Sequence, residues 1–353
     1  MARTARRAGQ SRQDVTTPNG RRSRPAARPA DDGRATHDEA AYPRLTARFW
    51  GVRGSHPAPF ATGSRFGGNT ACVELRFGRH LLIFDAGSGI VGLGDALARE
   101  WHDRSPAARP TLTLLFTHAH HDHLCGLPFF APLFEPGADV HLVGPDLAGL
   151  RFEQIVAGYM RTPYFPVDFY DLPSRRHLRS ISDGARLVWT ADGDSPVTVP
   201  QDASIPPDAL VVDVLHTQLH PREGTLVYRA TGGGRSLVFA TDVEVGERGG
   251  AGERRFVRFV RGADVLVHDA QYSDEDYDGA TPHRGFGHST PAMAARVARA
   301  AEVDRLILFH HDPNYPDADV LALERAARQL FPRTWAAREG GEIWLDGQEE
   351  RHV

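Results

Sequence analysis

A series of short apolar or alternating segments, each ended by a turn, constrains the fold of this chain more than any other feature. Glycine, proline and aspartate separate the segments, as expected for strands bounded by tight turns. Helical signals lie between some of them: Thr290 and Pro291 form an N-cap and a first helical position, and Asp317 or Asp319 begins another helix. Strands interleaved with helices predict a layered α/β architecture. The segments are Cys72-Phe77, Leu81-Asp85, Thr111-Thr117, Val140-Val143, Leu210-Leu215, Thr225-Arg229, Ser236-Thr241, Val265-His268, Arg305-His310 and Glu342-Asp346.

The first 44 residues have a different composition. They hold Arg, Ala, Pro, Gly, Asp and Ser with almost no large apolar side chain, so they cannot bury enough surface to offset the entropy of ordering. We expect a disordered Arg-rich tail over residues 1–44 and one folded domain over residues 45–348. A polyanion-binding role is the alternative for the tail. An apolar content of 41% suffices for a substantial core in the domain.

Composition also narrows location and partners. No stretch reaches the ~18 to 20 consecutive apolar residues of a membrane span, and no apolar segment of a secretory signal begins the chain. We therefore expect a cytoplasmic protein with no membrane partner. Cys72 and Cys125 are far apart in apolar surroundings and indicate reduced thiols. The net charge of −4 provides no general attraction to nucleic acid.

The run His118-Ala119-His120-His121-Asp122-His123 concentrates metal-ligand side chains on a loop after the apolar segment Thr111-Thr117. Further candidates, His220, Asp242 and His310, each follow another apolar segment. Imidazole and carboxylate groups suit Zn, Mn or Fe. The sequence thus predicts a centre for two divalent ions, most simply Zn. The neighbouring His121, His216 and His311 are alternative ligands, and the choice between His310 and His311 is open.

These motifs resemble the metallo-β-lactamase superfamily, on Thr117-His-Ala-His-His-Asp-His123 and on the strand turn Leu82-Ile-Phe-Asp85-Ala-Gly-Ser-Gly89. The resemblance covers about residues 47–347 and implies an αββα sandwich of two mixed sheets flanked by helices. It also implies a ligand set: one metal on His118, His120 and His220, a second on Asp122, His123 and His310, and Asp242 bridging both. Asp85 would support the ligand loop from behind.

Two further motifs indicate a branch of the superfamily. Val267-His-Asp269-Ala-Gln271 and Gly287-His288-Ser-Thr290 resemble elements of the ribonuclease Z-like phosphodiesterases, in which a carboxylate and a histidine form an acid dyad. The resemblance implies that Asp269 holds His288 as the proton donor to a leaving alkoxide. Alternatively, His288 only helps to cap the helix that begins after Thr290. The sequence departs from ribonuclease Z in two ways. Asp269 stands in place of Glu, and no long basic Gly/Pro-rich insertion resembles the arm that binds tRNA in those enzymes.

Flanking motifs resemble bacterial superfamily members grouped with cyclic-nucleotide and small-phosphodiester hydrolases: Phe49-Trp-Gly-Val-Arg-Gly-Ser55, Phe66-Gly-Gly-Asn-Thr70, Gly126-Leu-Pro-Phe-Phe130, Pro163-Tyr-Phe-Pro-Val167 and Phe309-His-His-Asp-Pro313. We therefore expect hydrolysis of a small phosphodiester, above all a cyclic nucleotide, by a metal-bridging hydroxide, with His288, Asp269 and Asp122 in the catalytic set and a homodimeric assembly. The alternatives are ribonuclease Z-like tRNA 3′ processing with a nucleic-acid partner, a non-phosphate hydrolase, an iron-dependent oxidoreductase, or a non-catalytic nucleotide-binding regulator.

Overall fold

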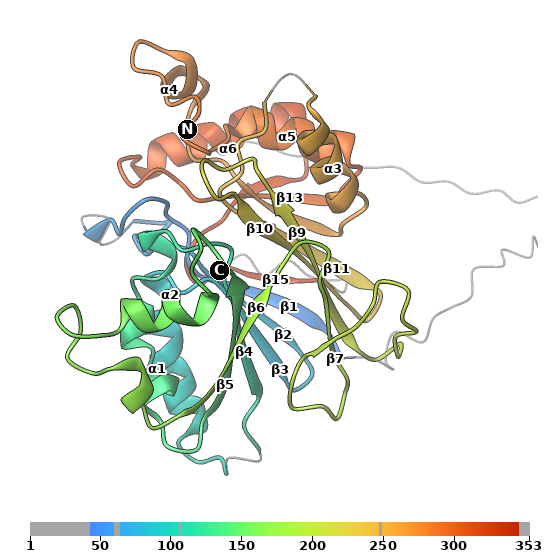
Figure 1. The fold of residues 1–353 in the computed structure, drawn as a ribbon. Coiled ribbons are helices and arrows are strands. Elements are labelled where there is room, and N and C mark those ends of the chain that lie inside the picture. Colours follow the sequence, from blue (N-terminus) through green and yellow to red (C-terminus); the bar gives the residue numbers. More distant parts are fainter. Residues whose placement is uncertain (1–42, 60–63, 106–107, 247–248, 346–353) are drawn as a thin grey trace, which may run out of the picture. The chain divides into compact units, whose positions relative to one another are not determined.

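The structure is a computed structural model that describes residues 43–59, 64–105, 108–246 and 249–345. The predicted tail, except its last two residues, and the final residues of the predicted domain lie outside this part of the chain. Two mixed sheets form the described domain (Figure 1). In spatial order, the first consists of β15 (Glu342–Trp344), β1 (Leu45–Gly51), β2 (Cys72–Phe77), β3 (His80–Phe84), β4 (Thr111–Leu115), β5 (Asp139–Pro145) and β6 (Arg175–Ile181).

The second sheet has eight strands, of which the first four in spatial order run parallel to one another. In spatial order, it consists of β14 (Thr334–Ala336), β13 (Arg305–Phe309), β12 (Val265–Asp269), β11 (Arg235–Ala240), β10 (Thr225–Gly232), β9 (Leu210–Thr217), β7 (Arg186–Trp189) and β8 (Val197–Thr198).

Helices flank both sheets (Figure 1). Side chains of α1 and α2 pack against the outer face of the first sheet, and those of α3, α5 and α6 against the second. The helices are α1 (Gly89–Trp101), α2 (Phe152–Tyr159), α3 (Ala251–Val260), α4 (Asp274–Asp278), α5 (Pro291–Ala300) and α6 (Asp317–Leu330), with 3₁₀ turns η3 (His121–His123), η4 (Leu127–Phe129), η5 (Ala131–Phe134) and η6 (Phe169–Asp171). The predicted αββα architecture is confirmed.

The main core lies between the two sheets, where alternate residues of both face inward. Phe84 of β3 stacks on Phe239 of β11 with ring centroids 5.1 Å apart, so the two strands that precede Asp85 and Asp242 are fixed to each other. The Thr290 side chain accepts a hydrogen bond from the Met293 amide and caps α5 as predicted. No helix of the described residues is long and apolar enough to cross a membrane.

Candidate metal centre

The predicted site residues meet where parallel strands of both sheets end. Asp85 follows β3, His118 follows β4, and Asp242 and His310 follow β11 and β13, while Asp269 is the last residue of β12. Carboxyl ends of parallel strands lie at one edge of a sheet, where loops carry the chemistry. The fold therefore brings together residues from distant parts of the chain.

The seven predicted ligands form two neighbouring groups with Asp242 between them. Asp242 Oδ1 lies 3.2 Å from both His123 Nε2 and His310 Nε2. Its other oxygen, Oδ2, lies 3.5 Å from His118 Nε2 and 3.8 Å from His220 Nε2. Asp242 thus presents one oxygen to each group, as a bridging ligand would. The groups are His118, His120, His220 and Asp242, and Asp122, His123 and His310, with ligand atoms in each within 4.8 Å of one another.

The alternative histidines point elsewhere. His311 Nε2 lies 2.9 Å from the Ala337 carbonyl oxygen. His121 contacts the Tyr159 hydroxyl at 3.1 Å, and His216 lies 2.9 Å from the Glu223 carbonyl oxygen. The geometry therefore favours His310 over His311.

The residues present fit a divalent cation. The Nε2 atoms of His118 and His123 are buried without a hydrogen-bond partner, although buried polar atoms are normally paired. Burial lowers the pKa of His118 well below its usual value, helped by repulsion from His123, so its imidazole is neutral and can bind a metal. Burial opposes ionisation of Asp122, but attraction to His123 outweighs it and holds the pKa of that carboxyl well below its usual range. Neutral imidazoles and ionised carboxylates are metal ligands.

Outer hydrogen bonds orient the ligands. Asp85, fully buried, lies 2.8 Å from His123 Nδ1 and accepts a bond from the Thr117 amide at 2.8 Å. The Thr117 hydroxyl lies 3.0 Å from His118 Nδ1. The Gly287 carbonyl lies 3.0 Å from His220 Nδ1. Each contact fixes which ring nitrogen faces the centre.

Two orienting residues were missed as functional positions, although both lie in motifs that the sequence analysis singled out. Gln271 Oε1 lies 2.9 Å from His310 Nδ1, and its amide nitrogen donates to the Ser55 hydroxyl at 3.0 Å. The Ser55 amide donates to Asp122 Oδ2 at 2.8 Å. Together, Ser55 and Gln271 connect two ligands of the second group.

Left-handed backbone conformations recur at the strand ends. Asp85, Asp242 and His310 have φ values of 60°, 53° and 64°. Non-glycine residues seldom adopt such angles, and they concentrate at sites where the surroundings hold them. At each of these residues the chain turns sharply, so the strand ends at the metal centre.

His288 and Asp269 form the predicted pair beside the cluster. His288 Nδ1 lies 2.7 Å from Asp269 Oδ2, and the His288 ring stacks on His310 with centroids 5.0 Å apart. Asp269 also accepts hydrogen bonds from the amides of Asp242 at 3.1 Å and Ser289 at 2.9 Å. Asp269 and His288 lie close enough to Asp242 and His310 to act as ligands. Both oxygens of the Asp269 carboxylate, however, already accept hydrogen bonds from backbone amides.

The pair keeps the imidazole charged. Burial lowers the pKa of His288, but attraction to the Asp269 carboxylate outweighs it and raises the pKa to about 9. His288 is therefore an imidazolium at neutral pH, held by Nδ1 with Nε2 free of that contact. A positioned imidazolium can donate a proton to a leaving oxygen.

Comparison with known proteins agrees with this geometry. A family model described as a beta-lactamase superfamily domain matches residues 80–311, which contain every predicted ligand and the dyad. The chain belongs to the metallo-β-lactamase superfamily.

Similar proteins place this superfamily member in the ribonuclease Z-like branch. A ribonuclease Z of Bradyrhizobium sp. (strain ORS 278) is 30% identical over 321 residues, covering 78% of this chain and 96% of the relative. A ribonuclease Z of Thermoplasma acidophilum is 26% identical over 316 residues, covering 82% and 93%. The crystal structure of Zn²⁺-bound PqqB from Methylobacterium extorquens shares the fold, with a TM-score of 0.58, 16% identity and coverage of 84% and 99%. The chain is thus a metal-dependent hydrolase of the phosphodiesterase type.

Gly54, which lies beside His310, provides a test of the proposed metal centre. A Cβ atom on Gly54 would lie 2.4 Å from His310 Nδ1 and 2.8 Å from Gln271 Oε1. We expect Gly54→Ala to displace the His310 ring and weaken metal binding by about 10- to 100-fold, the usual effect of disturbing the outer partner of a ligand. Equilibrium dialysis against Zn²⁺ measures this. Gly92→Ala in α1, whose Cβ would come no closer than 3.6 Å to another group, is the control; equal affinities of the two variants would contradict the expectation.

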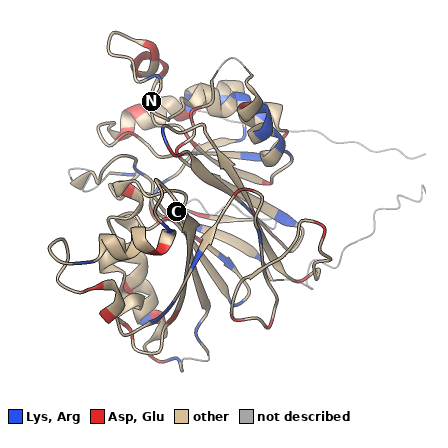
Figure 2. Ribbon diagram, viewed as in Figure 1, with Lys and Arg blue, Asp and Glu red and all other residues tan. Residues whose placement is uncertain are grey.

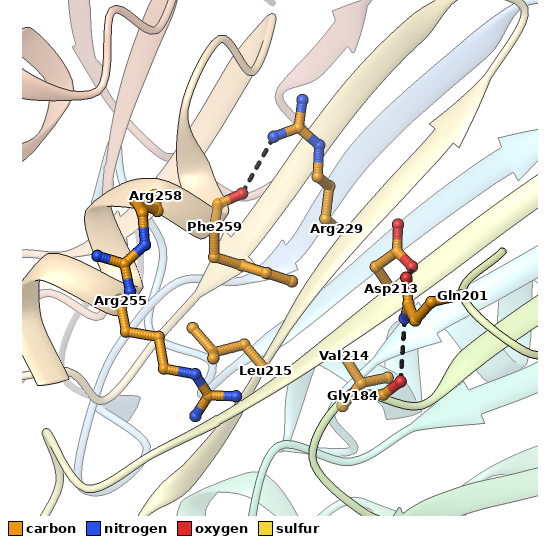
Figure 3. Close-up of a pocket in the computed structure, with 9 residues that line it drawn as sticks. All are labelled: Gly184, Gln201, Asp213, Val214, Leu215, Arg229, Arg255, Arg258 and Phe259. Carbon is orange, nitrogen blue, oxygen red and sulfur yellow. Dashed lines mark hydrogen bonds between the residues drawn. The ribbon is translucent and has the colours of Figure 1, made fainter.

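A hollow of about 490 Å³ lies apart from the predicted ligands, between α3 and β9 (Figure 3). Arg229 of β10 and Arg255 and Arg258 of α3 line it (Figure 3), and Figure 2 shows the concentration of basic residues on α3. Arg229 donates to the carbonyls of Phe259 at 3.0 Å and Arg261 at 2.8 Å, which satisfies the carboxyl end of α3. Arg255 pairs with Asp183. Arg229 and Arg255 therefore already serve the fold, and none of the predicted ligands or dyad residues lines the hollow.

Proposed function

We propose that this chain is a two-metal ribonuclease of the ribonuclease Z type that hydrolyses a phosphodiester bond of RNA at the 3′ end of tRNA precursors. The contact between His288 and Asp269, at 2.7 Å beside the ligand cluster, carries the hydrolytic part of the proposal. The RNA substrate is supported by the relatives, since the Bradyrhizobium ribonuclease Z aligns along 96% of its length. These relatives favour RNA over the cyclic nucleotide expected from the flanking motifs.

The ligand set follows the two observed groups. One ion would bind His118, His120 and His220, a second would bind Asp122, His123 and His310, and Asp242 would bridge them. Zn²⁺ suits this set, and Mn or Fe also binds such ligands. When bound, such ions activate a water molecule and neutralise charge on phosphoryl oxygens.

The protein's own residues perform the remaining chemistry. His288, charged at neutral pH, donates its proton to the oxygen of the departing strand, and Asp269 holds the imidazole in place during the transfer. The Asp242 amide donates to the same Asp269 carboxylate, so the proton donor and the proposed bridging ligand keep a fixed separation. His120 is the most exposed of the ligands and marks the side from which substrate enters.

A small phosphodiester remains a second candidate, and one sequence observation favours it: the chain lacks a long basic Gly/Pro-rich insertion resembling the tRNA-gripping arm. The aromatic segment between α2 and η6 suits either substrate. Phe165 packs on Phe129 with centroids 5.7 Å apart, whereas the Tyr164 side chain is 77% exposed. An exposed aromatic ring can stack on a base of RNA or of a nucleotide.

Direct assays distinguish the two candidates. Zn²⁺-loaded protein is incubated with a tRNA precursor that carries a 3′ trailer, and in parallel with 3′,5′- and 2′,3′-cyclic nucleotides. We expect release of the trailer at a higher kcat/KM than opening of either cyclic nucleotide, with Asp122→Ala as the inactive control. Cleavage of cyclic nucleotides alone would replace the proposal with the second candidate.

A further inference from the structure

A second cluster of metal-ligand side chains lies at the amino ends of β5 and β6. Asp139 and His141 belong to β5, and His177 of β6 pairs with His141 in the parallel register. Residues two apart on a strand, and direct cross-strand partners, project from the same face. The proposed catalytic residues follow the carboxyl ends of strands. This cluster therefore lies at the opposite ends of the strands of the first sheet.

The three side chains converge on one point. Asp139 Oδ1 lies 2.6 Å from His177 Nε2 and 4.0 Å from His141 Nε2. The two imidazole rings stack with centroids 4.6 Å apart and planes inclined by 18°. A ligand atom from each residue lies within 4.8 Å of the other two. Two imidazoles and one carboxylate are a set that transition metals bind.

A hydrogen bond does not account for the short contact between Asp139 and His177. Asp139 Oδ1 is buried and accepts no hydrogen bond, even though His177 Nε2 is so close. The short distance therefore lacks the geometry in which an N–H points at the oxygen. The carboxylate is oriented from its far side, because Arg175 holds the other oxygen, Oδ2, at 2.9 Å. Ligating carboxylates are commonly held by such a partner.

The segment between β7 and β8 supplies a fourth group. The Ser195 hydroxyl lies 3.2 Å from His141 Nε2, and His141 itself is buried. The cluster thus lies between the two strand ends and the polar segment that contains Ser195. An ion held there would connect three separate parts of the chain.

We propose that Asp139, His141 and His177 form a second binding site for a divalent transition-metal ion such as Zn²⁺, separate from the catalytic centre. Zn²⁺ accepts three protein ligands, and a water molecule or the Ser195 hydroxyl completes its coordination. Its role is structural: the ion stabilises the edge of the first sheet formed by β5 and β6 and anchors the segment around Ser195. The inference is independent of the proposed substrate.

Metal content of the full-length protein tests this site. Wild type, His177→Ala and the surface control His102→Ala are saturated with Zn²⁺, desalted and measured by elemental analysis. We expect His177→Ala to hold one equivalent fewer than wild type, and His102→Ala to match wild type. Because His177 is 51% exposed, its replacement should not prevent folding, and circular dichroism checks this. Equal stoichiometry in all three proteins would overturn the proposal.

A second readout separates this site from catalysis. Zn²⁺ should raise the melting temperature of wild type more than that of His177→Ala, since a ligand that binds only the folded state stabilises it. Asp139→Asn, which keeps the shape and removes the charge, should behave like His177→Ala. Phosphodiesterase turnover should be unchanged in both variants. If both lose turnover but keep their zinc, the site proposal fails; if wild type lacks phosphodiesterase activity but the zinc difference persists, only the proposed function fails.

Discussion

Replacing His288 by alanine should lower the turnover of an RNA phosphodiester by about 10²- to 10⁴-fold, the usual contribution of a positioned general acid. The leaving oxygen then departs without a proton from the protein. Metal content should stay at the wild-type value, because His288 is held by Asp269 and is not one of the proposed ligands. Single-turnover cleavage and elemental analysis on the same preparation measure both quantities.

A good leaving group isolates the role of His288. Hydrolysis of an aryl phosphodiester releases a stable phenolate that needs little protonation, so His288→Ala should lose far less activity on it than on RNA. His283→Ala is the matched control, since its ring stacks on Tyr272 at 4.5 Å, outside the dyad. An equal loss on both substrates would indicate a structural role for His288, and an unchanged rate on RNA would refute the dyad.

Replacing Asp122 by alanine should remove a metal ion and lower activity by more than about 100-fold. Loss of an outer hydrogen-bond partner of a ligand lowers activity by at most about that factor. Asp122 Oδ2 lies 3.2 Å from His310 Nε2 and 3.3 Å from His123 Nε2. Without this carboxylate, the second ligand group keeps its histidines and the shared Asp242 but loses one of its two carboxylates.

Elemental analysis after desalting measures the loss. The control is Asp95→Ala, a replacement of an exposed aspartate in α1. Full metal content in Asp122→Ala would refute its assignment as a ligand. Activity restored by high Zn²⁺ would instead show that the ion binds the variant, but weakly.

The sequence identified candidate site residues where a polar residue directly follows a run of apolar ones. Asp242 and His310 could be predicted because each follows a buried strand, β11 or β13. The β6 strand, Arg175–Ile181, was not predicted, because most of its side chains are polar and only partly buried. Such a strand has no apolar alternation to identify it.

Contacts between distant segments were beyond prediction. Ser55 and Gln271 are 216 residues apart, and their hydrogen bond depends on how the segment after β1 lies beside the end of β12. The pairing of His141 with His177 likewise depends on the register of two strands. A single sequence contains the residues of such a site but not the alignment that unites them. The cyclic-nucleotide substrate stays a prediction, and the relatives named ribonuclease Z support the alternative substrate, RNA, better.

The hydrogen bond from the Asp242 amide to Asp269 sets a limit on how this protein can change its chemistry. The backbone amide of Asp242 and the side chain of Asp269 together join the proposed bridging ligand to the proposed proton donor, His288. A new side chain at position 242 leaves the amide donor in place, whereas a residue without a carboxylate at position 269 removes the acceptor. Position 269 is therefore the more constrained of the two, because its carboxylate contacts both the Asp242 amide and His288.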